Sequence, residues 1–135
     1  MEDLPYPLRE HAAGTLRAAS GRPLNEITEA ALDAGELTIA DTRISAATLL
    51  AQAEVARRAG YPQLAENLAR AAELTAVPNT EVLRIYDRLR PGRATHAELL
   101  ALAELLEREY SAHRCAGFIR EAAAVYLQRG LLRKA

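Results

Sequence analysis

Disulfide and metal chemistry are the first things that this sequence lacks. Among its 135 residues there is one cysteine, Cys115, so the chain cannot form an internal disulfide, a CxxC redox motif or a cysteine-rich metal framework. The three histidines, His11, His96 and His113, do not pair with one another or with Cys115 at a spacing that suits metal ligands. The sequence therefore predicts no metal site and favours a reducing compartment.

An excess of charge of one sign is also missing. The chain has 17 Lys+Arg against 18 Asp+Glu, a formal net charge of −1, which provides no basic field to attract phosphate backbones or anionic lipids. No window approaches the roughly 18 uninterrupted apolar residues of a membrane span, and residues 1–8 contain no signal-peptide core. The sequence therefore predicts a cytoplasmic protein without nucleic-acid or membrane partners.

The composition that remains is that of a folded protein. Half of the residues are hydrophobic and 26% are charged, which argues against disorder, and 135 residues is the size of one domain. Residues 1–27 are broken by prolines and glycines and lack a sustained hydrophobic period, so they are predicted to form an extended arm. Residues 28–135 are predicted to form one compact helical domain.

Two helices are predicted in the first half of that domain, before residue 60. Thr28 is a suitable cap for a short helix that ends at Gly35, and Ser45 for a longer one that runs to Ala59 and stops at Gly60. The inward face of the second helix is narrow and made of small apolar residues: Leu49, Ala53 and Ala56.

A third predicted helix begins at Pro62, a residue favoured in the first helical turn, and runs to about Val77, because Pro78 prevents its continuation. It is expected to form a tight antiparallel hairpin with the helix before it. Its inward face is predicted to be Leu64, Leu68, Ala71, Ala72 and Thr75.

The next helix is predicted to start at a capping Asn79 and to end at residues 90–92, where Arg-Pro-Gly stops it. Its apolar stripe is Val82, Ile85, Tyr86 and Leu89. At its end the side chains of Arg84, Arg88, Arg90 and Arg93 gather. Positive charge at a helix C-terminus favours capping or contact with a protein partner over binding of an anion.

The last segment opens at Thr95, which with Glu98 forms a capping box, and contains no further proline. We expect two helices broken at 110–113, where strong helix formers become sparse. The first has a leucine face of Leu99, Leu102, Leu105 and Leu106, and the second a stripe of Phe118, Ile119, Ala122, Val125 and Tyr126. No alternating β-branched run occurs, so the predicted fold is all-α with about five to six helices. The carboxylates of Glu104 and Glu107 are interpreted as solvated charges, and no catalytic residue is predicted.

Several ordered blocks of sequence then carry a resemblance that covers nearly the whole chain. They are PYPL at 5–8, DTRIS at 41–45, AAELTAVP at 71–78, IY at 85–86, LRPGR at 89–93 and FIREAA at 118–123. In this order and spacing they resemble the small (gamma) subunit of adenosylcobalamin-dependent diol and glycerol dehydratases. Arg88 and Gly117 depart from the residues usual in that family, and the family's longer N-terminal extension, linked to packaging in microcompartments, is not seen before residue 5.

The resemblance implies a non-catalytic chain that packs on a large catalytic subunit, in an assembly with a medium subunit that is usually a dimer of heterotrimers. Such enzymes convert a 1,2-diol or glycerol to an aldehyde and water by a radical mechanism. The resemblance places the substrate and metal residues in the large subunit, and adenosylcobalamin between the large and medium subunits, so this chain binds no cofactor alone.

The expected contact surface combines the N-terminal arm, the corner at 90–93 and exposed parts of the last helix. Its predicted residues are Tyr6, Leu8, Arg43, Tyr86, Arg90, Pro91, Arg93, Phe118, Arg120 and Tyr126. One alternative is a free-standing helical adaptor, because residues 49–72 are similar to a helical-repeat hairpin, although no second copy follows. Another is a small independent enzyme, which requires the lone histidines to converge in a pocket.

Overall fold

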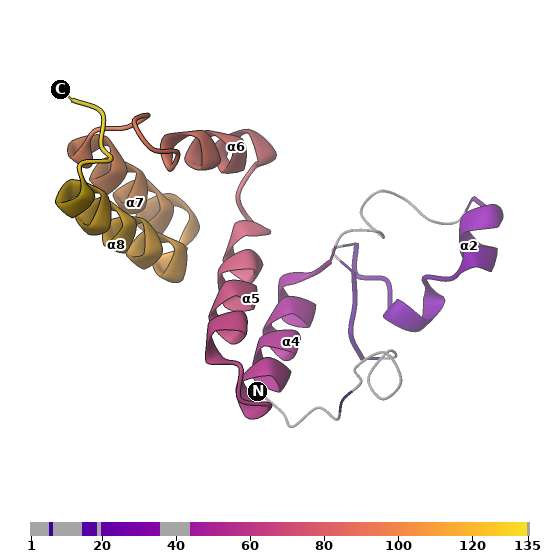
Figure 1. Ribbon diagram of the computed structural model, residues 1–135. Coiled ribbons are helices and arrows are strands. Elements are labelled where there is room, and N and C mark those ends of the chain that lie inside the picture. Colours follow the sequence, from indigo (N-terminus) through magenta and orange to yellow (C-terminus); the bar gives the residue numbers. More distant parts are fainter. Residues whose placement is uncertain (1–5, 7–14, 19, 36–43, 135) are drawn as a thin grey trace. The chain divides into compact units, whose positions relative to one another are not determined.

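The computed structural model describes residues 6, 15–18, 20–35 and 44–134 (Figure 1). In this part of the chain the regular structure consists of six α-helices and one 3-10 helix, with two isolated β-bridges and no strand. The predicted all-α class is therefore confirmed. The chain divides into two compact units, Met1–Ala72 and Glu73–Ala135, which are described in turn.

The first unit begins with short elements, η1 (Leu24–Glu26) and α2 (Glu29–Asp33). The Thr28 hydroxyl accepts a hydrogen bond from the Ala31 amide at 3.1 Å, as predicted for a cap. The described part of the N-terminal arm packs against the first turn of helix α4 (Ala46–Arg58). The Thr48 hydroxyl of this helix donates to the Arg17 carbonyl at 3.2 Å, and Ala18 is buried. The division of the chain at residues 27 and 28 stays a prediction.

Helices α4 (Ala46–Arg58) and α5 (Pro62–Leu74) form the predicted antiparallel hairpin (Figure 1). The Ser45 side chain accepts from the Thr48 amide and caps α4. Gly60 has a φ of 86°, a left-handed conformation that glycine adopts without steric cost and that allows the tight turn into Pro62. A small alanine cluster joins the two helices: Ala53, Ala56 and Ala65, with Leu68 packed against it.

The prediction for the inward face of α5 was largely wrong. The buried residues are Ala65, Ala69 and Ala72, whereas Leu64 is 50% exposed. Alanine lets the two helices approach closely, so the closer contact uses the alanine row, and the leucines lie at its edge. The helix also ends at Leu74, three residues earlier than predicted, because the backbone of Val77, which precedes Pro78, is restricted to extended conformations.

The second unit contains α6 (Asn79–Arg88), α7 (His96–Tyr110) and α8 (His113–Arg129). Helices α7 and α8 lie side by side (Figure 1) and supply most of the core. The core residues from these helices are Leu99, Leu102, Ala103, Leu106, Cys115, Ala116, Ile119 and Ala123. The predicted break between the helices is confirmed, and Ser111 makes the turn with a φ of 52°.

Two of the predicted caps in this unit have different outcomes. Thr95 and Glu98 form the capping box of α7, with both reciprocal hydrogen bonds present. Asn79, in contrast, is the first residue of α6 and not its cap; Pro78 occupies that position, without a side-chain hydrogen bond. The fixed φ of proline sets the start of this helix without help from the Asn79 amide.

Candidate interaction surface

An open groove in the second unit lies between α6, the corner that follows it, and α8. Its lining residues are Tyr86, Leu89, Arg90, Pro91, Phe118, Glu121, Ala122, Val125 and Tyr126. Five of the ten predicted interface residues are among them, from two separate stretches of the sequence, 86–91 and 118–126: Tyr86, Arg90, Pro91, Phe118 and Tyr126. The structure therefore brings half of the predicted surface together in one place.

The aromatic side chains of this groove are exposed. Tyr86 is 73% and Phe118 44% exposed; both belong to the apolar stripes predicted for their helices and to the predicted interface. Within those stripes the neighbouring isoleucines, Ile85 and Ile119, fill the core, at 9% and 1% exposure. Large exposed aromatic side chains that line one groove are typical of a surface that binds another protein.

The corner between α6 and α7 is held rigidly by the end of the chain. The Tyr126 hydroxyl donates a hydrogen bond to the Leu89 carbonyl at 2.6 Å. The Gly92 amide donates to the Leu131 carbonyl at 2.8 Å, and the Arg93 amide to the Arg90 carbonyl at 3.2 Å. The groove is thus built on fixed backbone and does not depend on a loose loop.

The arginines at the end of α6 are engaged within the chain. Arg84 pairs with Glu81 at 3.5 Å, and Arg90 with Asp87 at 4.0 Å. The Arg88 guanidinium donates to the Arg93 carbonyl at 3.4 Å, beyond the end of the helix. The acceptor lies in the corner and not among the last carbonyls of α6, so capping of the helix by these arginines stays a prediction.

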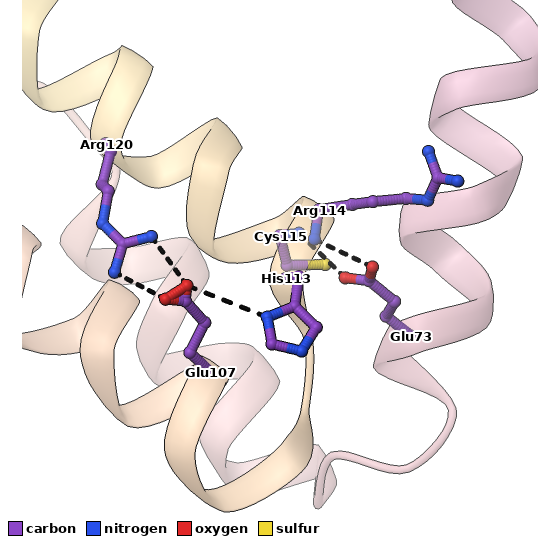
Figure 2. A network of polar contacts seen from close by, with 6 residues as sticks. All are labelled: Glu73, Glu107, His113, Arg114, Cys115 and Arg120. Atoms are coloured by element: carbon purple, nitrogen blue, oxygen red, sulfur yellow. Dashed lines mark hydrogen bonds and ion pairs between the residues drawn. The ribbon is translucent and has the colours of Figure 1, made fainter.

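Arg120 was predicted at the interface, but its guanidinium contacts α7 of its own chain. It makes two hydrogen bonds to the Glu107 carboxylate, both at 2.9 Å, and His113 Nδ1 lies 3.9 Å from the same carboxylate (Figure 2). The hydrogen bond from Arg120 holds the pKa of Glu107 below its ordinary value, and the carboxylate raises the pKa of Arg120. Glu107 therefore bridges α7 and α8 at the surface, so this exposed carboxylate also has a specific partner that the sequence did not predict.

We expect this bridge to appear in the acid stability of the chain. A carboxylate with a lowered folded pKa contributes stability that is present above its ordinary pKa of 4.5 and is lost as the pH falls below it. Glu107→Gln should therefore be less stable than the unmodified chain at neutral pH, and the difference should shrink below pH 4.5. Urea unfolding midpoints across pH measure this. Glu104→Gln, three residues earlier, is the matched control, and equal pH profiles for both variants would contradict the bridge.

The remaining predicted residues lie elsewhere. Tyr6 is 72% exposed and lines a second groove, in the first unit, with residues of α4 and α5 that include Val55, Leu64 and Leu68. Arg93 is an exposed residue of the corner. Leu8 and Arg43 fall outside the described residues.

Glu121 is a groove residue that the sequence analysis missed. It lies in α8, on the exposed surface, and within the described residues no hydrogen bond or ion pair reaches its carboxylate. A signal for it was present in the sequence, since the residues three and four positions away on the helix are Gly117, Phe118, Ala124 and Val125, none of them basic.

The histidines of the described region do not converge. His96 begins α7 and His113 begins α8, so they are separated by the length of α7, about 22 Å for 15 residues at 1.5 Å each. No three His, Cys, Asp or Glu side chains of the described residues are placed to hold a metal ion together. None of the helices in that part of the chain is long and apolar enough to cross a membrane.

A helical unit with an exposed aromatic groove beside a hydrogen-bonded corner is typical of a protein that contacts another protein. The chain belongs to the dehydratase small subunit family, whose sequence model matches residues 1–133. It is 44% identical over 128 residues to the propanediol dehydratase small subunits of Citrobacter freundii and of Salmonella typhimurium strain LT2. Each alignment covers 95% of this chain and 74% of the relative.

These similarities confirm the family resemblance carried by the sequence blocks. They also favour the role of an enzyme subunit over that of a free-standing adaptor. A small subunit of a dehydratase has other subunits of that enzyme as its partners.

Proposed function

We propose that the chain is the non-catalytic small subunit of an adenosylcobalamin-dependent diol or glycerol dehydratase, which converts a 1,2-diol or glycerol to an aldehyde and water. The observation that supports this most strongly is the 44% identity, over 95% of the chain, to propanediol dehydratase small subunits. The chain packs on the large catalytic subunit and stabilises it. The complete enzyme also contains a medium subunit, is a dimer of heterotrimers and is cytoplasmic.

We assign adenosylcobalamin to the other subunits, as the resemblance to the dehydratase family implies. The groove between α6 and α8 is lined mostly by apolar side chains and holds no histidine that could ligate cobalt. His113 lies against the Glu107 carboxylate, at the far end of α7 from His96. What this chain contributes is a binding surface and not a reacting group.

That surface includes the ten residues predicted from the sequence. The five that line the groove of the second unit are its centre, because aromatic side chains contribute most of the binding energy at protein interfaces. Tyr6 extends the contact to the first unit.

Co-expression with the large and medium dehydratase subunits tests this function. We expect the three chains to elute as one complex, and diol-to-aldehyde activity with added adenosylcobalamin to fall when this chain is omitted. Elution of this chain alone, with activity unchanged by its omission, would favour the adaptor instead.

Single substitutions test the interface within the same complex. Tyr6→Ala and Arg90→Ala should each weaken assembly by removing side chains from the contact surface. Arg57→Ala is the matched control for Arg90→Ala, since both arginines pair with an acidic residue three positions earlier in the sequence. If Tyr6→Ala and Arg90→Ala both leave assembly and activity unchanged, this assignment of the interface is wrong.

A further inference from the structure

We propose that the groove between α6 and α8 receives an apolar side chain from another dehydratase subunit, and that Glu121 binds a lysine or arginine next to that side chain. The proposal rests on the proposed function and goes further, because it fixes the face of this chain and the chemistry of its partner. Its basis is the shape of the groove and one unpaired charge.

The groove has a small residue, Ala122, between larger apolar side chains. Phe118, Ala122 and Val125 follow one another along one face of α8 at helical spacing, with the alanine between two larger side chains. Across from them lie Tyr86 and Pro91 of α6 and its corner. An aliphatic or aromatic side chain that enters over Ala122 would be surrounded by apolar atoms, which is the arrangement of an interface anchor in its pocket.

Glu121 differs from the other acidic residues that the structure describes in the second unit, each of which accepts a hydrogen bond or lies in an ion pair. Glu81 pairs with Arg84, Asp87 with Arg90 and Glu104 with Arg108, in each case a basic residue three or four positions further along the chain. The Glu121 carboxylate has no such partner within the described residues. An unpaired carboxylate is costly to bury, so an occupant that covers the groove must bring a positive charge to this edge.

The groove of the first unit is a weaker candidate for the same partner. It is lined by Tyr6, an aromatic residue of the chain's own N-terminal segment, and its charged lining residue is Arg58, which pairs with Glu54. The groove that is lined by an unpaired carboxylate is the one between α6 and α8 in the second unit.

Photo-crosslinking in the assembled enzyme tests the face. A benzophenone amino acid replaces Phe118 in one variant and Leu100 in the other; Leu100 lies on α7, has a similar exposure of 39% and does not line the groove. We expect the Phe118 variant to form an adduct with another dehydratase subunit and the Leu100 variant to form none.

An assembled, active enzyme in which the Phe118 variant forms no adduct, or crosslinks only to a second copy of this chain, overturns the proposal and leaves the proposed function intact. If the unmodified chain forms no complex at all, the proposed function itself fails. The two failures are therefore distinguishable in one set of samples.

Charge reversal tests the role of Glu121. We expect Glu121→Arg to weaken binding to the other subunits by about tenfold or more, since it places like charges together at a covered edge. Glu104→Arg makes the same change of charge on the exposed side of α7 and should alter binding by less than about threefold. Equal effects of the two reversals would show that Glu121 recognises no specific charge.

Discussion

Leu106→Ala is expected to lower the free energy of unfolding of the isolated chain by about 2–5 kcal/mol. Leu106 is 1% exposed and lies in the core cluster that α7 and α8 share. Its neighbours in that cluster include Ala103, Ala112 and Ala116, which are already small and cannot move far enough to fill the space that the substitution leaves. The cost therefore contains both the lost burial of the leucine and the cavity that replaces it.

Urea unfolding of the full-length chain measures this difference, with Leu100→Ala as the matched control. Leu100 is on the same helix but is 39% exposed, so its truncation removes little buried surface and should cost less than about 1 kcal/mol. Similar losses for the two variants would mean that the contact between α7 and α8 is not the centre of this unit. Because the groove is built on α8, loss of this core should also weaken assembly.

Helix ends were predictable from the sequence wherever the signal is local. Ser45, Pro62 and the capping box of Thr95 with Glu98 act on backbone groups within one turn, so each can be recognised without knowledge of the fold. The break at 110–113 was likewise visible as a gap between strong helix formers. The leucine face of α7 was predicted correctly, because its hydrophobic period is long and wide.

The rotation of a helix with a mixed face was not predictable. In α6 and α8 both an isoleucine and the adjacent aromatic residue fit an apolar stripe, and only the packing of the unit decided that Ile85 and Ile119 lie inside while Tyr86 and Phe118 lie outside. The inward face of α5 was mispredicted for a similar reason, because both its leucines and its alanines fit an apolar stripe. These aromatic residues were nevertheless included in the predicted interface, and the groove they line is the strongest feature of the candidate site.

Contacts between residues far apart in the sequence were beyond the sequence analysis. The pairing of Arg120 with Glu107 joins two helices, and neither residue carries a signal for the other. The cap of α8 is a still more distant contact. Ala112, at the N-cap position, makes no side-chain hydrogen bond to the helix, so the first turn needs acceptors from elsewhere.

Those acceptors belong to Glu73, about forty residues earlier in the chain (Figure 2). Its two carboxylate oxygens accept hydrogen bonds from the amides of Arg114 and Cys115, at 2.9 and 2.8 Å. The negative charge also lies at the positive end of the α8 dipole. We therefore expect Glu73→Ala to destabilise the chain by about 1–3 kcal/mol, as for the loss of a charged cap.

The design of this experiment separates the cap from a general effect of charge. Glu73→Gln keeps one carbonyl acceptor and should lose roughly half as much stability as Glu73→Ala, since the amide group cannot accept the second bond. Amide hydrogen exchange at Arg114 and Cys115 should accelerate in both variants. Glu121→Ala is the control: it removes from α8 a carboxylate that is unpaired within the described residues. This change should alter the stability of the isolated chain by less than about 0.5 kcal/mol.

We thus expect substitutions at Glu73 and Glu121 to have opposite effects on folding and on subunit binding. Glu73 stabilises the fold of the isolated chain, whereas Glu121 affects binding to the other subunits and has little effect on the fold. If Glu73→Ala leaves both the unfolding midpoint and the exchange of the two amides unchanged, α8 does not depend on this cap. If Glu121→Ala destabilises the isolated chain as strongly as Glu73→Ala does, its carboxylate has an internal structural role and is not available to a partner.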